Sequence, residues 1–376
     1  MSGMTAPLAE QEPLAFAQLL LGLIDEGRRT ATYKLALLLA LLDCSVLQTD
    51  DEGRPGSRIG TRTLAARVIH LYWPQVQPFS LDGAPAKVLS QSSQSRAVTV
   101  DAVAHLRELA SARRITTLHG ARSALSTEYD ACLDRVELNF VQMPLGKLQR
   151  PAGVVGDGYP RFLYPDAAFT ERVTLVRLRA RPLEVVLEPG VADALVSLSG
   201  LIRPLLELHW TREVARFNAA TLAEDRLRDH LFGASRVSLQ RVLPGLTELQ
   251  QGRCFYCPSP LAKGQSDVDH FLPWSRVPND TLANLVVAHR RCNNAKRDHF
   301  AAFEHLESFA ERDRPDLAEV ALSLDWPLHA AEARRTAVSL YAHLPVGSQL
   351  CLAPGVFEVL DRTRRQRTLE LLTTSP

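Results

Sequence analysis

Four residues with metal-binding side chains stand as two closely spaced pairs in the last third of the sequence. Cys254 and Cys257 form a Cys-x-x-Cys pair, and His289 and Cys292 form a His-x-x-Cys pair after 31 intervening residues. Together they supply three thiolates and one imidazole, a closed ligand set that suits a structural Zn²⁺. A redox-active Cys-x-x-Cys would not explain the second pair. The sequence therefore predicts a zinc site.

A second group of polar residues lies between these pairs and just after them. Asp269 and His270 end a short expected strand, Asn284 lies further along, and Asn293 follows Cys292 directly. A histidine can take a proton from water near neutral pH, and carboxylate and amide oxygens bind hard divalent cations. Phosphodiester hydrolysis needs both functions. It also needs cations near the phosphates, which can come from Arg290, Arg291, Lys296 and Arg297.

The segment from about residue 250 to about residue 300 resembles the HNH endonuclease family. The active site of that family is a ββα-metal unit, which a structural zinc ion stabilises in one branch of the family. The spacing is also similar to that of the HNH domain of CRISPR RNA-guided nucleases. His289 stands where a cysteine is common, a mild departure because histidine is an ordinary zinc ligand. The resemblance covers about one seventh of the chain and rests on Cys254-x2-Cys257, Asp269-His270-x2-Pro273, Asn284 and Cys292-Asn293-x2-Lys296.

The resemblance implies a role for each matched residue in the catalytic group. His270 would be the general base that activates water. Asp269 and Asn293 would hold one catalytic Mg²⁺ or Mn²⁺, with Asn294 as the neighbouring alternative to Asn293. Asn284 would brace the loop and orient the base. The expected products carry 5′-phosphate and 3′-hydroxyl ends.

The resemblance leaves two roles open for Lys296, which would touch phosphate or support the helix that carries it. Arg290, Arg291 and Arg297 are expected to contact the nucleic-acid backbone. The zinc ligands would be structural and would take no part in the chemistry.

The rest of the sequence predicts a mainly α-helical, multidomain protein around this module. Apolar residues recur at helical spacing over residues 16–42, 61–72, 97–113 and 191–217. The first of these ranges is expected to form two helices. Short strands are expected at 114–118, 136–141 and 183–187. The Gly- and Pro-rich stretch at 151–160 is the best candidate for a linker.

Four parts are expected on this basis. Residues 1–150 form a helical N-terminal domain for recognition or partner binding, with a winged-helix reader of nucleic acid as an alternative to a helical scaffold. Residues 151–245 form a helical middle region and 246–310 the nuclease module. A helical extension follows at 311–376.

Composition excludes several classes of protein. The net charge is +1, from 43 basic and 42 acidic residues, so any contact with nucleic acid must use a local patch. No apolar run approaches the ~20 residues of a membrane span. The N-terminus has no pattern of a secretory signal, so a cytoplasmic location is expected.

The expected function is metal-dependent hydrolysis of phosphodiester bonds, most of all in DNA, with RNA left open. By analogy, bacterial defence or restriction is the expected setting. One alternative is a catalytically silent, zinc-stabilised nucleic-acid-binding subunit. Another is the nuclease subunit of a multi-protein defence complex that needs a partner. A single site cuts one strand, so double-strand breaks would need a dimer or two events.

Overall fold

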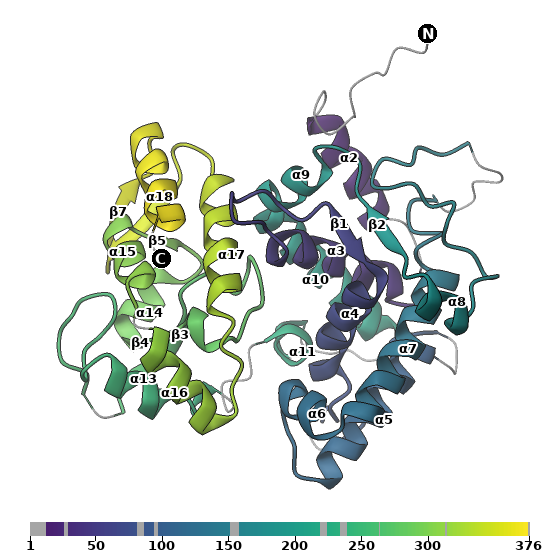
Figure 1. The fold of residues 1–376 in the computed structure, drawn as a ribbon, viewed down its shortest axis with the longest axis horizontal. Coiled ribbons are helices and arrows are strands. Elements are labelled where there is room, and N and C mark those ends of the chain that lie inside the picture. The colour runs from purple at the N-terminus through teal and green to yellow at the C-terminus, as the bar shows by residue number, and fades with distance from the viewer. Residues whose placement is uncertain are drawn as a thin grey trace. The chain divides into compact units, whose positions relative to one another are not determined.

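The chain divides into two compact units, each described by itself. A computed structural model describes residues 13–25, 29–80, 86–93, 97–150, 158–218, 224–233, 239–262, 264–312 and 314–374. Unit 1 comprises Met1–Ser45 and Gly56–Gly233, and unit 2 comprises Val46–Pro55 and Ala234–Pro376. The fold is mainly helical with small sheets, as expected (Figure 1).

Unit 1 is a helical assembly with one two-stranded antiparallel sheet. Its core gathers around α3, in which every residue from Leu35 to Leu42 is buried. The helices are α2 (Pro13–Ile24), α3 (Tyr33–Leu47), α4 (Thr61–Gln75), α5 (Val98–Ala112), α6 (Leu118–Ala124), α7 (Ser126–Gln142), α8 (Leu175–Ala180), α9 (Val191–Ser197), α10 (Ser199–Phe217) and α11 (Glu224–Phe232), and the strands are β1 (Arg58–Gly60) and β2 (Glu184–Val186).

Most sequence expectations for unit 1 are confirmed. The two helices expected within 16–42 are α2 and α3, and the strand expected at 183–187 contains β2. The strand expected at 136–141 is wrong, because these residues lie inside α7. Leu133, Val136 and Phe140 are buried at helical spacing, so their side chains reach the core from one helix face. Residues 114–118 form no strand either.

A buried ion pair links three elements of unit 1. Asp43 of α3 is fully buried, and its carboxylate lies 2.6 Å from Nε of Arg67 on α4. It also pairs with the guanidinium of Arg203 on α10, which is 1% exposed. Burial lowers the pKa of Arg203 to about 10, a value at which the side chain still carries its charge near neutral pH. Asp43, Arg67 and Arg203 therefore bring one negative and two positive charges together inside the core.

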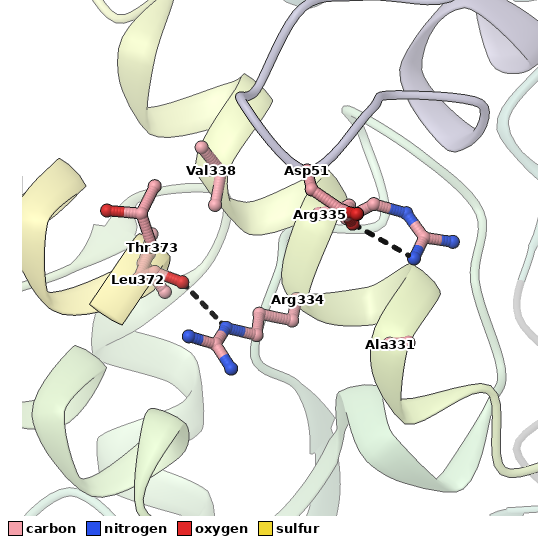
Figure 2. Close-up of a pocket in the computed structure, with 7 residues that line it drawn as sticks. All are labelled: Asp51, Ala331, Arg334, Arg335, Val338, Leu372 and Thr373. Carbon is pink, nitrogen blue, oxygen red and sulfur yellow. Dashed lines mark hydrogen bonds and ion pairs between the residues drawn. The ribbon is translucent and has the colours of Figure 1, made fainter. Parts of the chain in front are cut away.

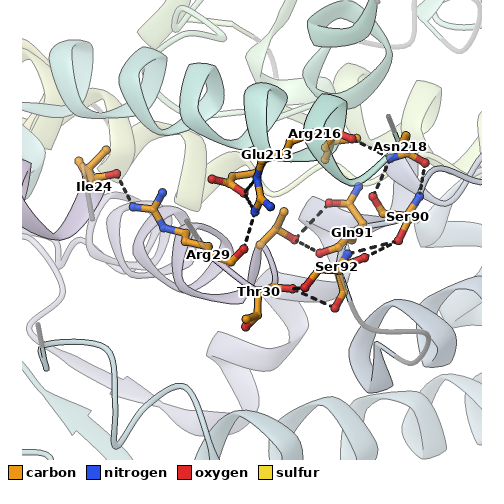
Figure 3. Close-up of polar contacts among 12 residues, drawn as sticks. Ile24, Arg29, Thr30, Ser90, Gln91, Ser92, Glu213, Arg216 and Asn218 are labelled. Atoms are coloured by element: carbon orange, nitrogen blue, oxygen red, sulfur yellow. Dashed lines mark hydrogen bonds and ion pairs between the residues drawn. The ribbon is translucent and has the colours of Figure 1, made fainter. Parts of the chain in front are cut away.

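Polar contacts also join α2, α10 and the loop before α5, as Figure 3 shows. Arg216 of α10 donates to the main-chain oxygen of Arg29 and pairs with Glu213. Asn218 exchanges two hydrogen bonds of 2.9 Å with the main chain of Ser90. These contacts anchor the end of α10 to segments far away in the sequence.

Unit 2 contains the predicted zinc and nuclease residues. A hydrophobic cluster that includes Val268, Leu285, Val287 and Trp326 packs strands against helices. The elements are α13 (Leu243–Leu249), β3 (Ser266–His270), the 3-10 helix η1 (Leu282–Asn284), β4 (Leu285–His289), α14 (Arg290–Lys296), β5 (Phe300–Ala301), α15 (Phe303–Ala310), α16 (Arg314–Leu324), α17 (Ala330–Ala342), β6 (Gln349–Ala353), β7 (Val356–Val359) and α18 (Arg362–Thr374).

The C-terminal part of unit 2 holds a sheet that the sequence did not predict. β5 pairs in parallel with β6, and β6 pairs with β7 in antiparallel fashion. The hydroxyl of Tyr341 on α17 donates to the main-chain oxygen of Ala301 in β5. The chain that follows the nuclease residues is therefore tied directly to distant C-terminal strands.

Segment Val46–Pro55 contacts the same part of unit 2, as Figure 2 shows. Asp51 lies 3.5 Å from the guanidinium of Arg335 on α17, beside a small pocket. Arg334 of α17 donates 2.6 Å to the main-chain oxygen of Leu372 on α18. Helix α17 therefore contacts segment 46–55 through Arg335 and α18 through Arg334.

Two sequence expectations remain open after this description. Residues 151–157 of the expected linker lie outside the described residues. The division into four parts is finer than the two units and stays a prediction. Among the described residues, no helix has both the length and the apolar character that a membrane span requires.

Candidate active site

The predicted site residues are carried by a hairpin followed at once by a helix. β3 and β4 pair antiparallel, with Ser266 opposite His289 and His270 opposite Leu285. α14 begins directly after β4 and packs on β3 and β6. This is the ββα arrangement that the resemblance implies. It brings the end of β3, the start of β4 and the inner face of α14 together.

The two predicted metal-binding pairs meet at one point. The ligand atoms of Cys254, Cys257, His289 and Cys292 all lie within 4.8 Å of one another. The main-chain N–H of Cys254 donates to Ser259 3.0 Å away, which closes the turn that carries the first pair. The second pair stands at the end of β4 and on α14. This cluster is able to hold a metal ion, as the spacing predicted.

A hydrogen bond sets which nitrogen of His289 faces the cluster. Its Nε2 lies 3.0 Å from the main-chain oxygen of Pro260, and its Nδ1 lies 3.3 Å from Sγ of Cys257. A carbonyl oxygen can only accept, so Nε2 carries the proton and Nδ1 presents its lone pair to the metal. The imidazole is thereby oriented before any ion binds.

The thiols of the cluster differ in acidity. Burial, together with the nearby Cys254 and Cys257, raises the pKa of the Cys292 thiol to about 12. Burial also raises the pKa of Cys257, but hydrogen bonds from Ser259 and Cys254 help to outweigh it, and the pKa is lowered to about 6. A bound dication would offset the repulsion between neighbouring thiolates that helps to keep the Cys292 thiol protonated. The donor set therefore fits Zn²⁺.

Asp269 is a buried carboxylate at the end of β3 with two partners on one oxygen. The hydroxyl of Tyr256 donates to its Oδ2 over 2.6 Å, and Nζ of Lys296 lies 3.2 Å from the same Oδ2. Burial and the Asp269 charge raise the pKa of Tyr256 well above its ordinary value. The phenol therefore stays protonated and donates. Tyr256, which stands between the two cysteines of the first pair, was not predicted as a site residue.

Lys296 requires a correction. It was expected among the nucleic-acid-binding residues, but its side chain is 1% exposed. Its Nζ donates 2.8 Å to the main-chain oxygen of His270. A cation enclosed between a carboxylate and a carbonyl cannot reach a phosphate from there. Lys296 instead supports the helix and the end of β3, the second of its two predicted roles.

His270 is held by a carboxylate that the sequence analysis missed. Its Nε2 lies 2.7 Å from Oδ1 of Asp280, and its ring centroid lies 4.9 Å from that of Trp274. The side chain is mostly buried, with 9% of its surface exposed. Asp280 is held in turn by Trp326, whose Nε1 donates 2.7 Å to its main-chain oxygen. The sequence signal for Asp280 is the polar pair 279–280, which alone is typical of a turn.

Comparisons with known families agree with the two units. A family model described as "Domain of unknown function (DUF8808)" matches residues 13–231, more than half of the chain. The chain belongs to the DUF8808 family. A second model, described as HNH endonuclease, matches residues 254–302, which we call the HNH module. This match confirms the resemblance seen in the sequence. No curated protein and no solved structure matches the chain.

Asn284 joins the two ends of the loop that follows β3 in the HNH module. The residue is fully buried. Its Oδ1 accepts 2.8 Å from the main-chain N–H of Leu272, and its Nδ2 donates 3.0 Å to the main-chain oxygen of Asn279. These are the contacts expected of a side chain that braces the loop, and Asp280 follows directly after Asn279.

The outer face of α14 in the HNH module is basic. Arg290, Arg291 and Arg297 are exposed, and Nε of Arg290 lies 3.4 Å from Oδ1 of Asp267. Asn293 is half-buried on the same helix, whereas Asn294 is exposed. The arginines at the two ends of α14 are therefore exposed, whereas Cys292 and Lys296 of the same helix are buried.

Proposed function

We propose that this DUF8808 protein is a metal-dependent endonuclease that hydrolyses phosphodiester bonds of DNA at its HNH module. The observation that carries the proposal is the pair formed by His270 and Asp280, 2.7 Å apart, with Asp269 directly before His270 at the end of β3. A zinc-binding fold alone has no need of an imidazole held by a carboxylate.

His270 acts as the general base in this proposal. Asp280 accepts a hydrogen bond from Nε2–H, so Nδ1 is left to take a proton from the attacking water. The carboxylate then stabilises the imidazolium that forms, as in other histidine–carboxylate pairs. Asn284 keeps the loop that carries Asp280 in place.

Asp269 and Asn293 hold the catalytic cation, proposed to be Mg²⁺ or Mn²⁺. When bound, such a cation neutralises charge on the scissile phosphate and on the leaving 3′ oxygen. Carboxylate and amide oxygens are suitable ligands for it. Structural Zn²⁺ on Cys254, Cys257, His289 and Cys292 joins the Cys254–Cys257 turn, which we call the zinc knuckle, to β4 and α14. It thereby fixes the helix that carries Asn293.

The exposed arginines 290, 291 and 297 contact the phosphate backbone. Three exposed arginines at the two ends of the short helix α14 suit the phosphates of a duplex, and this favours DNA as the substrate. A role in bacterial defence and a partner protein stay predictions that rest on family analogy. A cytoplasmic location stays a prediction from the sequence.

The test is a cleavage assay on supercoiled plasmid with a series of divalent metals, beside His270→Ala. Wild type should convert the plasmid to open circles with Mg²⁺ or Mn²⁺, and His270→Ala should bind DNA but leave it uncut. Labelled RNA is assayed in parallel to decide the substrate. Failure of the wild type to cut either substrate with either metal contradicts the proposal.

A second candidate is a silent nucleic-acid-binding module, and one observation favours it. The imidazole of His270 is 9% exposed, and the ring of Trp274 lies against it. If that arrangement persists on nucleic acid, water cannot reach Nδ1. Retained DNA binding together with identical, negligible cleavage by wild type and His270→Ala would decide for this reading.

A further inference from the structure

The hydroxyl of Tyr256 connects the zinc knuckle to the carboxylate of Asp269, the residue directly before the proposed general base. Tyr256 lies between Cys254 and Cys257, and it is 6% exposed. Its phenol oxygen is 2.6 Å from Oδ2 of Asp269. The turn that carries two proposed zinc ligands therefore also contacts Asp269, which is proposed to bind the catalytic cation.

The ring of Tyr256 is fixed by its neighbours, so the direction of its hydroxyl is fixed as well. The ring packs edge-on against Phe255, with centroids 5.4 Å apart, and against His305 of α15, with centroids 5.3 Å apart. His305 is itself anchored by a 2.7 Å hydrogen bond to the main-chain oxygen of Leu352 in β6. A rigid donor selects one orientation of the group that accepts from it.

The two oxygens of Asp269 have different surroundings. Oδ2 receives both the Tyr256 hydroxyl and, at 3.2 Å, Nζ of Lys296. Within the part of the chain that the structure describes, Oδ1 takes part in none of the hydrogen bonds and ion pairs. With Oδ2 occupied by two donors, Oδ1 is the oxygen left for a cation.

We propose that Tyr256 is a positioning residue that fixes Asp269 as a one-oxygen ligand, offering Oδ1 to the catalytic cation. This inference rests on the proposed function. It also makes the orientation of the catalytic ligand depend on the zinc knuckle. Loss of the hydroxyl leaves Lys296 at 3.2 Å as the partner of Oδ2, so the carboxylate is held less firmly and must be reoriented when the cation binds.

The test is Tyr256→Phe, which removes one oxygen and keeps the ring. Mn²⁺ is titrated into the full, zinc-loaded chain without nucleic acid, and free Mn²⁺ is read by electron paramagnetic resonance. Asp269→Asn identifies the site. We expect Tyr256→Phe to bind Mn²⁺ about 10-fold to 100-fold more weakly, the usual effect of losing a partner of a metal ligand. Its zinc content should equal that of the wild type.

The matched control is Tyr341→Phe. This change also removes a buried hydroxyl in unit 2, one that donates 2.9 Å to Ala301 and does not touch Asp269. It should leave Mn²⁺ affinity unchanged. Equal Mn²⁺ affinities of Tyr256→Phe and wild type overturn the inference, and so does an equal loss in the control.

A structure of the Mn²⁺-bound wild type gives a second measurement that does not depend on any variant folding. One oxygen of Asp269 on the ion, with the other on Tyr256, supports the inference. Both oxygens on the ion overturn it. Because these readouts need no cleavage, a wild type that binds Mn²⁺ as described but cuts nothing would contradict the proposed function alone.

Discussion

The hydrogen bond between His270 and Asp280 predicts a specific loss of activity in Asp280→Asn. The substitution keeps the shape of the side chain but removes the charge that stabilises the imidazolium. A hydrogen bond to a charged group is worth about 1.5–3 kcal/mol. The Asp280 side chain is 32% exposed, and water therefore screens its charge, which favours the lower part of this range. At about 1.4 kcal/mol per tenfold change in rate, we expect a loss of about 10-fold to 50-fold.

The assay is the single-turnover nicking rate on supercoiled plasmid at saturating Mg²⁺, with zinc content measured on the same samples. Asp267→Asn is the matched control. Its side chain is 33% exposed and pairs with Arg290, and an exposed pair is worth at most about 1 kcal/mol, or less than about fivefold in rate. A rate for Asp280→Asn as close to wild type as that of the control would refute the role given to Asp280.

Three further predictions concern the zinc cluster and the stability of each unit. In zinc-free protein at pH 7, iodoacetamide should label Cys257, with a pKa of about 6, before Cys292, with a pKa of about 12. The labelling rate of Cys257 should fall as the pH drops through 6, because only the thiolate reacts, and bound zinc should protect both thiols. Equal labelling of the two cysteines in peptide mass spectra would contradict the assignment. Asn284→Leu leaves main-chain groups of a buried loop without partners, so the free energy of unfolding of unit 2 in a denaturant titration should fall by about 2–5 kcal/mol, and a loss below 1 kcal/mol would speak against the bracing role. Asp43→Ala removes the fully buried carboxylate that pairs with Arg203 and leaves that guanidinium with Glu207 at 3.9 Å, which should cost unit 1 about 3–5 kcal/mol in the same titration, whereas unchanged stability would show that the Asp43 pair is dispensable.

The metal-binding residues were predictable because their geometry is local. A Cys-x-x-Cys turn and a His-x-x-Cys strand-to-helix junction each fix two ligands within a few residues, and one hairpin brings the pairs together. The helical character of unit 1 was predictable for a similar reason, since helix periodicity is a property of neighbouring residues.

Contacts between distant residues were not predictable in this way. Asp280 faces His270 because Trp326, 46 residues later, holds the loop. Lys296 looks like a surface cation in the sequence, yet it is buried because Asp269 and the main chain of His270 neutralise and satisfy it. Residues 136–141 contain two valines and a phenylalanine, which favour a strand, but burial on one helix face outweighs that preference.

Segment 46–55 makes unit 2 discontinuous, which bears on how the chain is synthesised. Asp51 leaves the ribosome about 280 residues before Arg335, its ion-pair partner. At about 5–20 residues per second, that gap corresponds to about 15–60 s of translation. Throughout this time the packing partners of the loop do not yet exist, so nascent chains should be open to proteolysis there until α17 has emerged. The unit that holds the HNH module therefore closes around a stretch of chain that was made long before the rest of that unit.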